Sequence, residues 1–348
     1  MKLIPIAYLN NIINILLIML NKLKGKVLEN SDSYNELKNE NEVTLKKLDK
    51  KINKLNKTVK RLEKENNSYN RLFKTLYLDY DIKPKGALKT TFDICQELLN
   101  LVDNVCKKHD IEYWLDYGNL LGAIRHGGFI PWDDDIDVGM MRNEFDKFYR
   151  VILEELKETG LDEIITITRD KIYGERKVIF FIQISVQDSE GRIFGGLDVF
   201  PYDYLIDSFD NIEEEFENTK KTYYDSFFDG VSYEENLKAY YDRMNLSFDK
   251  QKYVISGVDS VRAKKGIYNF EILSSDEIFP LKEIEFSGVK YPCPKNSDYY
   301  LEKIYGDYMD IPKVLRFHNR LNDLRKSPQL KEASIRYYNI LKEVNDSF

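Results

Sequence analysis

The sequence predicts an α+β fold built around a mixed sheet and preceded by a helical arm. Two observations support this prediction. From residue 83 onward, strand-length runs of β-branched and aromatic residues are interspersed with helical segments, without an internal repeat. Before that point, apolar residues recur at alternating spacings of three and four, as in a coiled coil. Pro84 and Gly86 interrupt the helical pattern and mark the boundary.

The composition restricts the class of partner. The 348-residue chain has a net charge of −7, but residues 1–80 hold 16 Lys and Arg against 9 Asp and Glu, and the remainder holds 36 against 50. A body this acidic lacks the basic face of a nucleic-acid-binding protein, so we expect no nucleic-acid partner. The three cysteines form no CxxC pair, which argues against a disulfide framework or a zinc site. They favour a reducing, cytoplasmic compartment.

Residues 1–26 form an apolar segment that contains nineteen consecutive uncharged positions. This length is at the short limit for a transmembrane helix, and no small-residue cleavage site of a signal peptide follows. Asn10, Asn14 and Asn21 would share one face of a helix. We therefore expect an amphipathic helix at the inner face of the cell membrane, with the lysines that follow it near anionic lipid. The alternatives are a helix packed within an oligomer and a true membrane span.

Residues 27–82 are predicted to form a parallel two-stranded coiled coil. The heptads place leucine at d and β-branched residues at a, with Leu48, Leu55 and Leu62 at d and Ile52 and Val59 at a. This combination favours two parallel strands, and the polar Asn66 at a further a position fixes their register. We expect the arm to make a homodimer and to carry no chemistry. The alternative is a single solvated helix that folds back on the body.

The body, residues 83–348, is predicted to be one catalytic domain. Apolar residues at helical spacing and Glu/Lys/Tyr-rich stretches predict helices over 87–108, 120–125, 144–156, 210–245, 260–275 and 299–304. Short β-branched or aromatic runs predict strands over 111–115, 136–141, 164–168, 178–186 and 196–205, and a hairpin over 284–291.

The most unusual stretch of the body is acidic. Four carboxylates fall within five positions, namely Asp133, Asp134, Asp135 and Asp137. Two charges about 4 Å apart repel by roughly 4 kcal/mol at an effective dielectric of 20, so we expect a bound cation, and magnesium or calcium suits all-oxygen ligands. Alternate residues of a strand share a face, so Asp135 and Asp137 would point to one side. Asp198, on a later apolar strand, is the candidate for a third carboxylate. Such a set would hold one or two Mg²⁺, or Asp198 would accept a proton from an attacking hydroxyl.

Three further interpretations concern the same region. Gly118 and Asn119 open a helix, whose backbone N–H groups would cradle a phosphate. An EF-hand would use Asp133, Asp135, Asp137 and Glu144 as its positions 1, 3, 5 and 12. Its sixth position requires Gly but is Val138, which argues against this loop. A plain solvated acidic turn is the remaining structural interpretation.

Residues 116–140, DYGNLLGAIRHGGFIPWDDDIDVGM, resemble the signature of the LicD family of phosphotransferases, to which fukutin and fukutin-related protein also belong. Two further family motifs follow in order, LDVFP at Leu197–Pro201 and an FPL…YL…YGD run from Phe279 to Asp307. The resemblance covers roughly residues 84–318. One departure is Asn119, where the family usually has Thr. Asn119 keeps a short polar side chain, so we expect little loss of function and at most a different acceptor or phosphate geometry.

The resemblance implies a nucleotidyltransferase-like fold that carries Mg²⁺. It also implies transfer of a phospho-substituent, phosphocholine in bacterial members, from a CDP-linked donor such as CDP-choline to a sugar hydroxyl of a surface glycan. Carried over by position, Asp135 and Asp137 would be metal ligands and Asp198 a third ligand or base, with Asp116, Asp133 and Asp134 supporting them. Arg125 and His126 would contact phosphate, as would Lys177, and Trp132 or Tyr202 would join a cation–π cage for choline.

Two other functions compete with this one. The first is a nucleotidyltransferase that attaches NMP to an acceptor, which would attack the other phosphorus of the donor. The second is a non-catalytic scaffold that uses only the coiled coil. The three carboxylates argue against the scaffold, because an inert site has no reason to keep all of them.

Overall fold

The computed structural model describes residues 32–78, 80, 83–173, 176–260, 270–310, 324 and 327–348. The chain divides into two units, Met1–Phe73 and Lys74–Phe348. Helix α2 (Asp32–Leu78) is continuous over 47 residues, in the range where a coiled coil is expected. The predicted d residues Leu48, Leu55 and Leu62 are 48%, 62% and 51% exposed in the single chain. The apolar segment 1–26 lies outside the described residues, so its relation to a membrane stays a prediction.

The large sheet is mixed, and β5 is its central strand. Its main path runs β1 (Trp114–Leu115), β2 (Ile136–Met141), β5 (Ile193–Leu205), β4 (Arg176–Gln187) and β3 (Ile165–Tyr173). Strands β2 and β5 are parallel, whereas β1–β2, β5–β4 and β4–β3 are antiparallel. The end of β5 also pairs with β6 (Leu246–Ser247) and β7 (Tyr253–Ser256), and β7 pairs with β8 (Leu273–Ser274). The predicted α+β fold with a mixed sheet is therefore confirmed.

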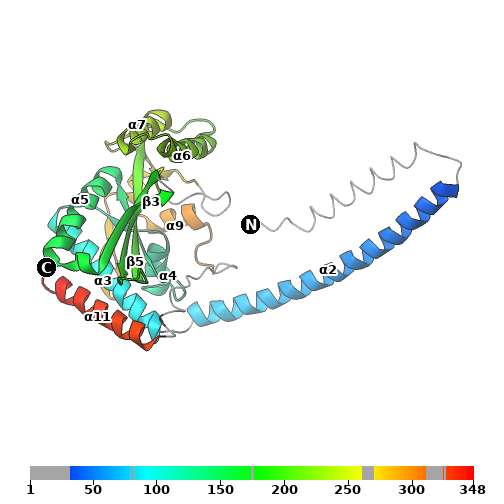
Figure 1. Cartoon of the computed structure of the whole chain (residues 1–348), viewed down its shortest axis with the longest axis horizontal. Coiled ribbons are helices and arrows are strands. Elements are labelled where there is room, and N and C mark those ends of the chain that lie inside the picture. The colour runs from blue at the N-terminus through cyan, green and yellow to red at the C-terminus, as the bar shows by residue number, and fades with distance from the viewer. Residues whose placement is uncertain are drawn as a thin grey trace. The chain divides into compact units, whose positions relative to one another are not determined.

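Helices cover both faces of this sheet (Figure 1). One face carries α3 (Ala87–Lys108), α5 (Arg142–Thr159) and α11 (Pro328–Asn345), and the other carries α4 (Tyr117–His126) and α9 (Ser297–Tyr305). The packing of α3 is close, because a Cβ built on Gly195 of β5 would lie 2.7 Å from the side chain of Ile94. On the opposite face, the ring of Tyr117 meets Phe200 edge-on at 5.1 Å.

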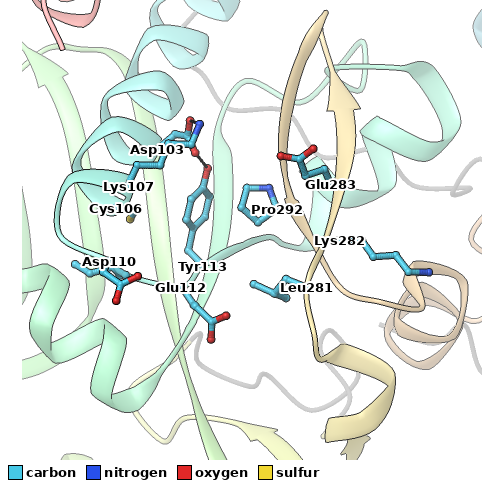
Figure 2. Close-up of a pocket in the computed structure, with 11 residues that line it drawn as sticks. Asp103, Cys106, Lys107, Asp110, Glu112, Tyr113, Leu281, Lys282, Glu283 and Pro292 are labelled. Atoms are coloured by element: carbon cyan, nitrogen blue, oxygen red, sulfur yellow. Dashed lines mark hydrogen bonds and ion pairs between the residues drawn. The ribbon is translucent and has the colours of Figure 1, made fainter.

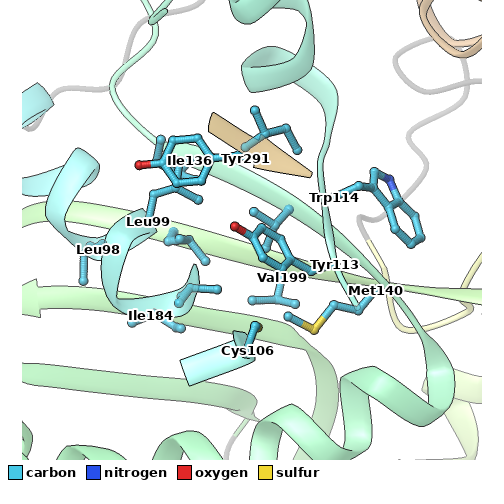
Figure 3. Close-up of a cluster of buried hydrophobic side chains, with 14 of the residues drawn as sticks. Leu98, Leu99, Cys106, Tyr113, Trp114, Ile136, Met140, Ile184, Val199 and Tyr291 are labelled. Atoms are coloured by element: carbon cyan, nitrogen blue, oxygen red, sulfur yellow. The ribbon is translucent and has the colours of Figure 1, made fainter. Parts of the chain in front are cut away.

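The main core lies between the sheet and α3. Side chains from α3, β1, β2, β4 and β5 interdigitate there, and the ring of Tyr291 from the β9–β10 hairpin closes one side (Figure 3). That hairpin consists of β9 (Lys282–Phe286) and β10 (Val289–Cys293). Trp114 is fully buried over Gly139, where a Cβ would come within 2.5 Å of the indole ring. A glycine at this position therefore allows β1 to bring Trp114 onto β2.

A second, smaller core lies at one end of the sheet, under α6 (Ile212–Phe228) and α7 (Tyr233–Met244) (Figure 1). The Arg142 guanidinium, 2% exposed, donates two hydrogen bonds each to the carboxylates of Asp203 and Asp259. Tyr241 of α7 donates to Asp203 as well, at 2.6 Å. Such paired charges tolerate burial because each polar atom has a partner. This network fixes the start of α5 to β5 and to α7.

Most of the predicted elements occur where the sequence places them. The helix at 87–108, the strand at 136–141 and the hairpin around 284–291 correspond to α3, β2 and β9–β10. The stretch 210–245 is two helices, because the chain turns at residues 229–230 between α6 and α7. The helix expected at 260–275 is wrong for residues 270–274, since Leu273–Ser274 pairs with β7 as β8 before the short α8 (Ser275–Ile278). A short 3₁₀ turn, η1 (Leu161–Glu163), precedes β3.

None of the helices in the described ranges is both long enough and apolar enough to cross a membrane.

Candidate active site

Asp137 and Asp198 lie side by side on the sheet. They are direct neighbours in the parallel register of β2 and β5, so both side chains project from the face that α4 and α9 cover. The flanking residues Ile136 and Val138 are fully buried on the opposite face, as the alternating pattern predicts. The strand pairing therefore brings together two carboxylates that are 61 positions apart in the sequence.

The charges around Asp137 are unfavourable to its ionised form. Burial, followed by the negative charges of Asp135, Asp198 and Asp133, raises the pKa of the Asp137 carboxyl well above its usual range. Asp135 occupies the bend directly before β2. A cation among these side chains would offset the repulsion and keep all of the carboxylates ionised.

Gly118 leaves space for this cluster. A Cβ built on Gly118 would lie 2.4 Å from Oδ2 of Asp133 and 3.9 Å from Oδ2 of Asp137. Oxygens of both carboxylates therefore lie in the space that a larger residue would fill. Asp133, expected only to support the metal ligands, thus lies closer to this space than Asp137 does.

Hard oxygen donors in this arrangement suit Mg²⁺. Within the described ranges, however, no three His, Cys, Asp or Glu side chains are already arranged to hold a metal ion. The donor chemistry and the space at Gly118 fit a small cation, while the carboxylates would have to turn toward it. The magnesium site therefore stays a proposal.

Helix α4 begins against this cluster through its cap residue. The carboxylate of Asp116 caps the helix by accepting a hydrogen bond from the backbone N–H of Tyr117, at 2.7 Å. Asp116 is fully buried, and it also accepts hydrogen bonds from the hydroxyls of Tyr202, at 2.6 Å, and Tyr300, at 2.8 Å. Trp114 donates in turn to the Tyr300 hydroxyl. Burial raises the pKa of Asp116 to about 6 although these three donors lower it.

The contacts of Asn119 differ from the predicted phosphate cradle. Its side chain is 4% exposed, and its Oδ1 accepts a hydrogen bond from the backbone N–H of Asp137 at 2.5 Å. Its own backbone N–H donates to the carbonyl oxygen of Asp116. Asn119 therefore ties α4 to the acidic strand, and these contacts give no support to phosphate binding by this residue.

Several predicted residues do meet in one cavity of about 400 Å³ beside Gly118. Its lining includes Gly118, Arg125, Trp132, Asp133, Tyr305, Asp307, Tyr308 and Asp310. The Arg125 guanidinium lies 5.9 Å from the centre of the Trp132 ring and donates to the carbonyl oxygens of Tyr308, at 2.9 Å, and Asp310, at 3.3 Å. Among the described residues, the lining of this cavity thus supplies one guanidinium, three carboxylates and three aromatic rings.

Other predicted residues have different surroundings. His126 accepts a hydrogen bond from Arg125 through its Nε2 atom and meets Trp132 edge-on, so it braces the cavity wall. Asp134 is 2% exposed. Lys177 lies in β4, and its side chain is outside the described part of the chain. Tyr202 is fully engaged beneath Asp116, so the predicted cation–π cage cannot include it.

Sequence reasoning missed two groups of residues. Tyr300 and Tyr305 reach the site from α9, and the only signal for them was their place in the YL…YGD run. Gln183 of β4 donates from its Nε2 atom to Oδ1 of Asp198 at 3.2 Å. The available signal for Gln183 was the alternation of Gln183, Ser185 and Gln187 with apolar residues, which predicts a polar face on this strand.

A different cavity of about 440 Å³ lies between the end of α3 and the β9–β10 hairpin (Figure 2). In it the Tyr113 hydroxyl donates to Asp103, which also accepts from Lys107. Among the side chains that the structure describes, no predicted site residue lines this cavity.

Residues 110–228 match the family described as LicD/FKTN/FKRP, nucleotidyltransferase domain. The lipopolysaccharide cholinephosphotransferase LicD of Haemophilus influenzae is 29% identical over 247 residues, which cover 63% of this chain and 90% of that protein. An uncharacterized protein of Rickettsia typhi is 34% identical over 132 residues, or 37% of this chain and 39% of the relative. The ribitol 5-phosphate transferase FKRP of Mus musculus is 47% identical over 45 residues, which cover 13% of this chain and 9% of that protein.

Proposed function

Because residues 110–228 match the nucleotidyltransferase domain of the LicD/FKTN/FKRP family, we propose that this chain is a Mg²⁺-dependent transferase. It moves phosphocholine, or a related phospho-substituent, from a CDP-linked donor to a sugar hydroxyl of a cell-surface glycan. The observation that carries the proposal is the direct pairing of Asp137 with Asp198, with Asp135 and Asp133 beside them. The names of the Haemophilus and Mus relatives support transfer of a phospho-group.

The carboxylates would hold the metal. Asp135, Asp137 and Asp198 are the proposed ligands for one or two Mg²⁺, and Asp133 faces the same space at Gly118. When bound, Mg²⁺ offsets charge on the transferring phosphoryl group and on the leaving oxygen. Asp116 acts through structure, since it caps α4 and is buried beneath the site.

The proposed reaction is a direct displacement at phosphorus, in which residues of this chain accept the proton and bind the phosphate. The sugar hydroxyl attacks the phosphorus that carries choline, the bond from that phosphorus to the bridging oxygen breaks, and CMP leaves. The hydroxyl proton passes to a carboxylate, for which Asp198 is the candidate if it is not a metal ligand. Arg125 is positioned to bind a phosphate, because its guanidinium is fixed to two carbonyl oxygens in the cavity wall. Burial lowers the pKa of Arg125, and a phosphate oxygen beside it would offset the lost hydration.

The cavity beside Gly118 suits the cationic end of the donor. Trp132, Tyr305 and Tyr308 supply aromatic surface, and Asp307 and Asp310 supply negative charge. Rings and carboxylates together attract a quaternary ammonium group. An alditol would instead use the carboxylates as hydrogen-bond acceptors, so the same cavity accommodates the main rival donor group.

The experiment that tests this function is calorimetric titration of the full chain with CDP-choline, CDP-glycerol, CDP-ribitol, CTP and UTP, each with and without Mg²⁺. We expect Mg²⁺-dependent binding of one CDP-linked compound that is tighter than binding of either triphosphate. Preference for a triphosphate would support the nucleotidyltransferase instead. No binding of any compound would favour the scaffold.

The proposed assembly is a parallel homodimer through α2. Leu48, Leu55 and Leu62 are about half exposed along one helix, and burying them against a second copy follows the a/d geometry of a two-stranded coil. Sedimentation of the full chain should give twice 41.2 kDa. Leu55→Lys should reduce this to one chain mass, while Lys57→Ala should not. A single chain mass for the unaltered protein would contradict the dimer.

A further inference from the structure

Gln183 is the first of three polar residues, with Ser185 and Gln187, that share one face of β4, and it is the one that lies directly opposite Asp198. Along one face of β4, Ile182, Ile184 and Val186 are buried in the main core, whereas Val178 and Phe180 are buried in the second core under α6 and α7. The opposite face, toward the active site, begins with the apolar Ile179 and Phe181, and then presents Gln183. An amide beside aromatic and aliphatic neighbours loses hydration, so its position calls for a partner.

The sheet register supplies that partner. Gln183 is the direct antiparallel neighbour of Asp198, and Asp198 is the direct parallel neighbour of Asp137. The three residues therefore form one row across β4, β5 and β2, on the same face. The Gln183 amide donates to Oδ1 of Asp198 at 3.2 Å from one side, while Asp137 flanks Asp198 on the other.

We propose that Gln183 positions the Asp198 carboxylate for the divalent cation. The inference rests on the proposed function, because it assigns Asp198 a place at the metal. A hydrogen bond to one carboxylate oxygen fixes the rotation of the group, so that it meets the cation in one orientation. Residues that hold metal ligands in this way typically affect metal affinity by about 10- to 100-fold.

A neutral donor is suited to this role. A lysine or arginine in the place of Gln183 would orient Asp198 but would also cancel the charge that attracts the cation. A glutamine amide orients the carboxylate and leaves its charge intact. An amide at this position therefore preserves the negative charge that Asp198 contributes to the cluster around Asp137.

The test measures Mn²⁺ affinity of the full chain by calorimetry, with no nucleotide present. Gln183→Met keeps the length of the side chain but removes the donor, so we expect at least about a 10-fold weaker affinity. The matched control is Ser185→Ala, on the same face of β4 and opposite Gly196, which should bind Mn²⁺ as the unaltered chain does. The metal-free melting temperature of Gln183→Met should equal that of the control.

A second comparison separates positioning from a general structural effect. If Gln183 acts through Asp198, then Gln183→Met should cause no further loss of affinity in an Asp198→Asn background. Unchanged Mn²⁺ affinity in Gln183→Met would overturn the inference and leave the proposed function standing. An equal loss in both backgrounds would also overturn it. Failure of the unaltered chain to bind Mn²⁺ would contradict the proposed function itself, and the inference with it.

Discussion

Asn119 accepts a hydrogen bond from the backbone N–H of Asp137, which joins the first turn of α4 to the strand that carries the acidic cluster. Asn119 is buried and Asp137 is half-buried. A backbone N–H in such surroundings costs free energy if it has no hydrogen-bond acceptor. The family departure at residue 119 therefore falls on a contact that holds the site together.

Asn119→Ala should destabilise the fold by about 1–3 kcal/mol, because the Asp137 N–H loses its acceptor. Urea unfolding followed by circular dichroism measures the change. Asn119→Thr, which restores the usual family residue and a short acceptor, should recover part of the loss. Equal stability of Asn119→Ala and the unaltered chain would show that the hydrogen bond contributes nothing.

Asp137→Asn should make the metal-free protein more stable at pH 7 while it abolishes Mg²⁺-dependent donor binding. The pKa of Asp137 is raised in the folded state, so the folded state disfavours its charge, and stability falls as pH rises above the unfolded value toward the folded one. Asparagine carries no charge at this position, so the variant avoids the loss of stability that occurs in the unaltered chain when Asp137 ionises. Denaturant titrations of both proteins in EDTA give the comparison, and a less stable variant would mean that the carboxylate has a structural role.

Asp116 should contribute a separate dependence of stability on pH. Its pKa is raised from 3.8 to about 6, so the folded state holds the proton more tightly than the unfolded state does. The stability of the unaltered chain relative to Asp116→Asn should therefore fall between about pH 4 and pH 6 and then level off. The total is on the order of 2–3 kcal/mol. A difference that stays flat across this range would contradict the raised pKa.

The convergence of the carboxylates was predictable because it follows from local pattern. Asp137 alternates with buried apolar neighbours, which fixes the face it occupies, and Asp198 sits in a strand of the same apolar type. Both strands belong to the buried middle of the sheet, where parallel pairing is expected for apolar runs. The fold class and the position of the acidic face could be predicted for the same reason, because both follow from local sequence pattern.

The contacts of Asn119, Tyr300 and Gln183 were not predictable from local pattern. Gln183 meets Asp198 only because β4 and β5 pair in one register, and a shift of one residue would turn its side chain to the opposite face. Asn119 was assigned to phosphate because it lies near a helix start, but Asp116 caps that helix. Tyr300 reaches Asp116 across 184 positions, through packing of α9 that no periodicity encodes.

The measurement that tests the central claim most directly is paramagnetic relaxation of the ³¹P signals of CDP-choline by Mn²⁺ on the full chain. Mn²⁺ held by Asp137 and Asp198 should strongly enhance relaxation of both donor phosphates, and Asp137→Asn should lose this enhancement. The same enhancement in Asp137→Asn, or none in the unaltered chain, would contradict a metal site on these two aspartates that binds the donor.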